Sequence, residues 1–180
     1  AGFDILGGAD NPLGSLTHYS GNISIMLSVS FLIVLGGIGF SVILDVLHYK
    51  KRNRLTLHSK IVLIATAVIL CFSTLVFLIA EWNVSLADMN FGKKLLNAFF
   101  MAVTPRTAGY YSVNLNEMTL FSRFFTIILM FVGASPASTG GGIKTTTAVI
   151  LLFVIFSGLK NQGKIVLDRR HISTRIIMRA

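Results

Sequence analysis

The chain has 180 residues, of which 53% are hydrophobic and only 13% are charged, and its formal net charge is +9. The hydrophobic residues stand in long runs and the basic residues gather between them, which argues against a soluble domain and against a nucleic-acid partner. The single cysteine, Cys71, excludes a disulfide framework. This composition indicates an all-α integral membrane protein.

The first part of the chain predicts a loop followed by one membrane-spanning helix. Residues 1–21 are rich in Gly, Asn, Asp and Ser and have no helical period. A transmembrane helix is predicted over 22–47, and the glycines within it would let a neighbouring helix approach closely. The loop over 48–59 is strongly basic, so the positive-inside rule makes it cytoplasmic and puts the start of the chain outside.

The next hydrophobic segments differ in length, and the difference is informative. A second transmembrane helix is predicted over 60–82, with an external connection over 83–90. The apolar segment 91–104 would measure only about 20 Å as a helix, against a hydrocarbon core of about 30 Å. A half-length apolar helix of this kind is typical of a pore helix that dips into the membrane from outside.

A predicted filter segment over 105–111 follows the pore helix. Potassium filters replace the ion's water of hydration with backbone carbonyls, and glycine allows successive carbonyls to point the same way. We expect Arg106 to brace this turn by bonding its carbonyls. The filter candidates are Thr107, Ala108, Gly109 and Tyr110.

The same small-Gly-aromatic pattern opens the chain at Ala1, Gly2 and Phe3, again before a polar loop and a long apolar run. This echo predicts a repeat of helix, pore helix, filter and helix. Two filter segments do not close a ring, because a potassium filter needs about four. The missing segments are expected in flanking sequence or in other chains, since both ends look cut.

The hydrophobic region 118–157 is too long for one straight span, because a single helix would reach about 60 Å. We expect a broken helix whose halves are joined at membrane depth by a glycine-rich loop over 133–144. Its consecutive glycines suggest exchange between blocking and retracted positions. The gate candidates are Gly133, Pro136, Ser138, Thr139, Gly140, Gly141, Gly142 and Lys144.

Lys144 has two interpretations. A lysine near mid-membrane is costly and usually marks function, which favours a gating role; alternatively, it starts the inner half-helix and reaches cytoplasmic water. A phosphate-binding loop is rejected, because Ile143 separates Gly142 from Lys144 and no strand precedes them. No catalytic set or metal cluster can be assembled from the few acids and histidines, so we do not expect an enzyme.

Four motifs together resemble the Trk/Ktr/HKT superfamily of potassium transporters, most closely the membrane subunit of the bacterial Ktr system. The resemblance implies an internal fragment of a four-repeat protein. Residues 1–59 would end the second repeat, 60–159 would form the third, and 160–180 would lead towards a missing fourth. The motifs are Ala1-Gly2-Phe3-Asp4, Gly36-Gly37-Ile38-Gly39-Phe40, Thr104 to Tyr110, and Ser138 to Thr145.

The resemblance also implies a function: potassium uptake across the plasma membrane, the inner membrane of a bacterium. It implies a homodimer of the full-length chain on a cytosolic regulatory subunit that binds nucleotide, and no cofactor in this chain besides the transported K⁺. Because each filter has a single strict glycine, sodium permeation or coupling stays open. Two alternatives remain: a tetrameric channel of two-helix subunits, and a structural membrane protein without transport.

Overall fold

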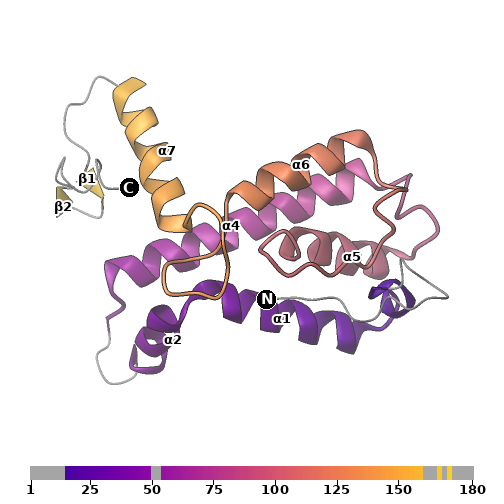
Figure 1. Cartoon of the computed structure of the whole chain (residues 1–180), viewed down its shortest axis with the longest axis horizontal. Helices are drawn as coiled ribbons and strands as arrows, with labels where there is room; N and C mark the ends of the chain where they lie inside the picture. The colour runs from indigo at the N-terminus through magenta and orange to yellow at the C-terminus, as the bar shows by residue number, and fades with distance from the viewer. Residues whose placement is uncertain (1–14, 50–53, 160–165, 168–169, 172–180) are drawn as a thin grey trace.

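The computed structural model describes residues 15–49, 54–159, 166–167 and 170–171. The filter candidates Ala1, Gly2 and Phe3, and most of 160–180, therefore lie outside the described residues. The predicted helical class is confirmed, and a two-residue antiparallel strand pair that was not predicted lies near the end of the described residues (Figure 1). The elements are η1 (Thr17–Tyr19), α1 (Ile23–Ile38), α2 (Phe40–Leu47), α4 (Leu57–Ala80), α5 (Phe91–Val103), α6 (Leu120–Phe131), α7 (Thr145–Leu159), β1 (Val166–Leu167) and β2 (Arg170–His171).

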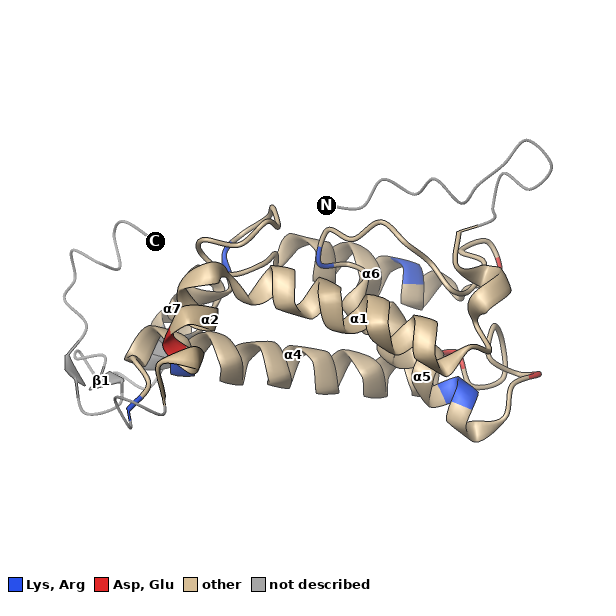
Figure 2. Cartoon of the chain, turned by 90° about the horizontal axis from the view of Figure 1, so that it is seen from below, with Lys and Arg blue, Asp and Glu red and all other residues tan. Residues whose placement is uncertain are grey.

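Helix α4 is the element on which the others are assembled, because it contacts α1, α2, α5, α6 and α7. It begins where the Thr56 side chain accepts a hydrogen bond from the Ser59 amide. Its 24 residues reach about 36 Å, and its mean hydropathy is 2.8. Figure 2 shows no charged residue along its middle. Among the described residues it is the one helix long and apolar enough to span a membrane; counting the bent pair α1 and α2 as one span gives two.

The single helix predicted over 22–47 is wrong. The run divides at Gly39 into α1 and α2, whose axes are bent by 97°. Gly39 has a φ of +92°, which L side chains rarely adopt, so the helix cannot continue through it. The glycines do accommodate a close neighbour, as expected, but that neighbour is the backbone of the 133–144 loop.

Helix α5 is largely enclosed by the rest of the described chain. Figure 1 shows it lying between α4 and α1. Met101 and Val103 belong to a core cluster that includes Leu70 and Phe77 of α4. Phe100 belongs to a second cluster, which reaches η1 and α1; its members are Leu16, Met26, Leu96 and Phe100. The second half of α5 therefore lies inside the described fold, whereas Phe91 and Leu95 near its start expose large apolar side chains, as α1, α4 and α6 do.

The carboxyl end of α4 is fixed to the start of α6 through Glu81, which is fully buried just past the end of α4. Its carboxylate accepts hydrogen bonds from the amide and hydroxyl of Thr119, at 2.9 and 2.7 Å, and from the Ser85 hydroxyl, at 2.7 Å. Burial by itself would raise the pKa of Glu81. The hydrogen bonds from Ser122, Thr119 and Ser85 outweigh that effect and lower it.

We predict that Glu81→Gln lowers the free energy of unfolding by about 2 kcal/mol at pH 7, because buried donors lose a charged acceptor. Since the folded-state pKa lies below the unfolded-state value, this stabilisation is complete above the unfolded pKa and disappears as the pH falls through the folded one. Unfolding temperatures of the purified protein at pH 7 and below about pH 4 would measure both effects. The matched control is Glu117→Gln, whose exposed carboxylate bonds only Asn114 among the described side chains; equal losses in both variants would contradict the prediction.

Candidate functional site

The predicted filter segment forms a tight turn at the end of α5. The Arg106 amide donates to the Val103 carbonyl at 3.2 Å, and the Ala108 amide donates to the Thr104 carbonyl at 3.2 Å. Thr107 has a φ of +64°, which is rare for a β-branched residue, and two residues later Gly109 has a φ of +80°. Strained backbone of this kind persists where the surrounding structure holds it, and it gathers at functional sites.

Both ends of the turn are anchored. Thr104 Oγ1 donates to the Tyr110 carbonyl, which ties the segment back to its own helix. The Tyr111 amide donates to Ser15 Oγ at 3.0 Å, and the Tyr111 carbonyl accepts from the Leu16 amide at 3.0 Å. Residues near the start of the described chain therefore hold the turn in place from outside the third predicted repeat.

The carbonyl oxygens of Thr107, Ala108 and Gly109 lie between these anchors. Among the described residues, nothing donates a hydrogen bond to the carbonyls of Thr107, Ala108 or Gly109. Thr107 and Gly109 are exposed in the described chain, whereas Ala108 is buried. Paired backbone groups are the rule inside proteins, so three successive unpaired carbonyls at the end of an enclosed helix form a row of free acceptors.

The 133–144 loop closes on itself at its base. Val132 and Ile143 form a parallel bridge, and the Gly133 amide donates to the Ile143 carbonyl at 2.9 Å. Lys144, next to this base, reaches into the loop, where its Nζ donates to the Gly140 carbonyl at 2.9 Å. Lys144 is only half-buried, and its ammonium group binds the backbone of the loop itself.

The loop glycines serve close approach. A Cβ on Gly133 would lie 1.8 Å from the Gly141 carbonyl oxygen, and one on Gly140 would lie 2.4 Å from the Ala134 Cβ. The same Cβ on Gly140 would be 3.0 Å from Thr107 Oγ1. The sequence suggested that these glycines make the loop flexible, and it did not reveal this close packing. The packing places the loop directly against the predicted filter turn.

The other predicted loop residues occupy the side that faces α1. Pro136 lies beside the break between α1 and α2, and the Thr139 amide donates to the Gly36 carbonyl at 3.4 Å. Ser138 Oγ donates to the Ser135 carbonyl within the loop. The structure thus brings together the filter turn, the loop and the α1–α2 break. The sequence signalled the third partner only through its cluster of glycines.

Arg106 does not bond the carbonyls of its turn as expected. Its side chain, 4% exposed, extends to α4, where Nη1 donates to Thr66 Oγ1 at 3.3 Å. Its Nε and Nη2 have no hydrogen-bond partner among the described residues. The residue therefore fixes the back of the filter turn to the middle of α4.

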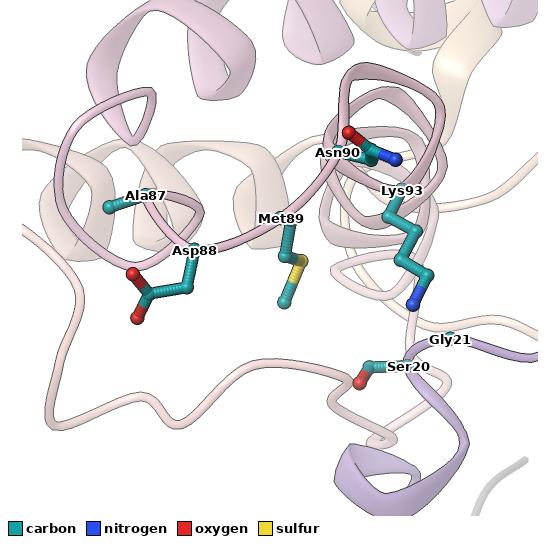
Figure 3. A pocket seen from close by; sticks show the side chains of 7 residues that line it. All are labelled: Ser20, Gly21, Ala87, Asp88, Met89, Asn90 and Lys93. Carbon is teal, nitrogen blue, oxygen red and sulfur yellow. The ribbon is translucent and has the colours of Figure 1, made fainter.

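A polar pocket of about 400 Å³ lies between the turn before α1, at Ser20 and Gly21, and the segment 87–90 before α5. Figure 3 shows Met89 between the Asp88 carboxylate and the Lys93 ammonium on its rim. No group of three His, Cys, Asp or Glu that could hold a metal occurs among the described residues. The neighbouring Lys94 is buried, and its Nζ donates to the Trp82 carbonyl at 2.8 Å.

The fold is that of an α-helical protein in which one helix, or two counting the bent pair α1 and α2, is long and apolar enough to cross a membrane among the described residues. The family described as TrkH, cation transport protein, matches residues 1–180. The chain therefore belongs to the TrkH family of cation transport proteins, as the sequence motifs predicted, and membership implies a membrane location.

Two curated relatives and one solved structure show how much of a family member this chain represents. It is 41% identical to the potassium/sodium uptake protein NtpJ of Enterococcus hirae over 100% of this chain and 39% of that protein. It is 36% identical to the Ktr system potassium uptake protein B of Bacillus subtilis, over 92% of this chain and 38% of that one. The potassium transporter TrkH of Vibrio parahaemolyticus shares the fold at a TM-score of 0.71 and 15% identity, covering 92% of this chain and 38% of that one.

The chain thus spans about two fifths of the length of these relatives. Both relatives are named as uptake proteins, which is consistent with the expectation that this chain is not an enzyme.

We predict that Thr66→Val lowers the stability of the protein by about 2 kcal/mol, because it removes the partner of a buried guanidinium. Adding Arg106→Met should restore part of that loss, since an apolar side chain of similar length needs no partner. Thermal unfolding of the single and double variants would measure the coupling. Ser73→Ala is the control on the same helix, because Ser73 Oγ is buried without a partner in the described chain; an effect as small as the control's would refute the role of Thr66.

Proposed function

We propose that this chain forms part of the cation pathway of a potassium uptake protein and that Thr107 to Tyr110 supply one segment of its selectivity filter. The observation that carries the proposal is the row of unpaired carbonyls at Thr107, Ala108 and Gly109. In a membrane, carbonyls left without a donor are tolerated where they line water or meet an ion. Their position at the carboxyl end of α5 also favours a cation, because that end carries a partial negative charge.

The chemistry proposed for these carbonyls is exchange of ligands. A K⁺ ion entering from outside would trade its waters for backbone oxygens of similar strength. The strained backbone at Thr107 and Gly109 would keep the oxygens in place without reorganisation at the moment of binding. A second filter segment is proposed at Ala1, Gly2 and Phe3, which lie outside the described residues, and the other two in parts of the full-length protein beyond this chain.

Potassium is proposed as the main cargo, with some sodium passing or coupled. Two relatives bear the names potassium/sodium uptake protein and Ktr system potassium uptake protein B. A filter with one strict glycine per segment would form fewer well-defined sites than a dedicated potassium channel. With fewer well-defined sites, the filter would select K⁺ over Na⁺ less strongly.

The 133–144 loop is proposed as the gate of this pathway, with the residues named from the sequence as its working parts. Its support is the contact between Gly140 and Thr107, which puts the loop beside the filter turn. Lys144 would act as a latch, because its bond to the Gly140 carbonyl holds the loop's tip to the start of α7. Opening would require that bond to break and the tip to move away from Thr107.

The surrounding organisation is proposed from the family. Residues 1–59 would complete the second repeat, 60–159 would form the third, and 160–180 would lead to a fourth. The full-length protein would work as a homodimer in the bacterial inner membrane, regulated by a cytosolic nucleotide-binding subunit. The name of a Ktr system supports more than one component.

We predict that Gly109→Ser in the full-length protein abolishes potassium uptake or reduces selection of K⁺ over Na⁺ by about tenfold. The φ of +80° at this position strains any L side chain, so the carbonyls would be displaced. Initial rates of Rb⁺ and Na⁺ uptake in potassium-starved bacteria lacking their own transporters would measure it. Gly92→Ser is the control, because a Cβ at Gly92 meets nothing within 4 Å. Unchanged uptake and selectivity in Gly109→Ser would favour a structural protein without transport.

We also predict that deleting Gly140–Gly142 raises flux and weakens its regulation. The deletion removes the part of the loop that contacts Thr107, together with the acceptor of the Lys144 bond. The same uptake assay, combined with membrane quantification of the protein, would give flux per molecule. A deletion variant that is present in the membrane at normal levels and conducts as before would refute the gate.

A further inference from the structure

The break between α1 and α2 is joined to the 133–144 loop along its whole width. The loop comes from the third predicted repeat and the break from the second, so their contact crosses a repeat boundary. We call residues Gly36–Phe40 the loop receptor. Three backbone hydrogen bonds connect the two: Ser135 amide to Gly37 carbonyl at 3.0 Å, Thr139 amide to Gly36 carbonyl at 3.4 Å, and Phe40 amide to Ala137 carbonyl at 3.0 Å.

These bonds satisfy groups that the two helices cannot pair themselves. Carbonyls in the last turn of a helix and amides in the first turn lack partners within the helix. The loop donates to the orphan carbonyls of α1 and accepts from the first amide of α2. Away from water each unpaired group is costly, so the loop and the break stabilise each other, and neither can move without exposing polar groups of the other.

The receptor also fits the loop sterically. Gly39 has a φ of +92°, and a Cβ on it would lie 2.6 Å from the Pro136 carbonyl oxygen. A Cβ on Gly36 would lie 3.3 Å from Thr139 Oγ1, still close but compatible with a small adjustment. The backbone of the loop therefore rests directly on the backbone of the receptor, with no side chain between them at Gly39.

Helix α2 connects the receptor to the other end of the fold. Asp45, in its last turn, accepts hydrogen bonds from the Thr56 amide at 2.8 Å and from Thr56 Oγ1 at 2.9 Å. Thr56 caps α4, so α2 is fixed at both ends: to the loop through Phe40 and to the start of α4 through Asp45. The basic segment expected on the cytoplasmic side lies between these two attachment points in the sequence.

We propose that the receptor Gly36–Phe40 holds the 133–144 loop in its blocking position and that displacement of α2 releases it. The inference rests on the proposed function of the loop as a gate. It adds positioning residues in another repeat that set the gate's equilibrium without touching the transported ion.

The first test is Phe40→Pro in the full-length protein. Proline lacks the amide that bonds Ala137, yet it is well accepted at the first position of a helix. The side chain of Phe40 is 66% exposed, so little packing is lost. We expect the maximal Rb⁺ uptake rate per molecule to rise about fivefold, as befits one lost hydrogen bond, with an unchanged ratio of K⁺ to Na⁺ uptake. A filter defect would change that ratio.

The control is Phe91→Pro. Phe91 is also the first residue of its helix, α5, and is 64% exposed. Its amide donates no hydrogen bond among the described residues. We expect wild-type flux from this variant. If Phe40→Pro and Phe91→Pro conduct alike, the receptor does not hold the loop.

A cross-link tests the contact without removing a bond. In a Cys71→Ser background, Gly36→Cys combined with Thr139→Cys should form a disulfide under oxidation, given the short distance between these positions. We expect flux to fall at least tenfold on oxidation and to return with a reductant, whereas oxidation should not change the flux of either single cysteine variant. Failure of the disulfide to form would refute the contact, and a cross-linked protein that conducts as before would refute the holding role.

The deletion of Gly140–Gly142 separates this inference from the gate itself. If the deletion raises flux but neither Phe40→Pro nor the cross-link alters it, the loop is a gate and the receptor is wrong. If the deletion and the cross-link both leave flux unchanged, the loop is not a gate, and the proposed holding role of the receptor is refuted as well.

Discussion

The structure depends on the need of backbone amides and carbonyls for partners where water is absent. A loop at membrane depth would be too costly if its polar groups faced hydrocarbon. Here the 133–144 segment pairs with its own base at Gly133 and Ile143, and with the orphan groups at the break between α1 and α2. The break and the loop therefore satisfy each other's backbone hydrogen bonds, although they lie in two distant parts of the sequence.

The same requirement explains why the filter turn stands out. Backbone hydrogen bonds at Val103, Thr104 and Tyr111 hold the segment on either side. Within that frame, the carbonyls of Thr107, Ala108 and Gly109 have no donor among the described residues. Helix α4 supplies that frame from behind, since Thr66 bonds Arg106 and the apolar face of α4 encloses α5.

The chain belongs to the TrkH family, but it spans only 39% of the length of NtpJ of Enterococcus hirae. The exposed apolar faces of α1, α4 and α6 fit a piece of a larger helical assembly surrounded by lipid or by further repeats. The filter, the gate and the receptor are accordingly proposals about the full-length protein.

The sequence by itself determined the helical membrane class, the family, the position of the short helix 91–104 and the interruption of 118–157, because length and composition report directly on a 30 Å hydrocarbon core. It could not reveal the 97° bend at Gly39 or the burial of Arg106 against Thr66. It also could not distinguish glycines used for freedom from those used for close approach, as at Gly133. Those features were decided by tertiary structure, because each depends on which distant backbone lies within hydrogen-bonding distance, and no local pattern encodes that.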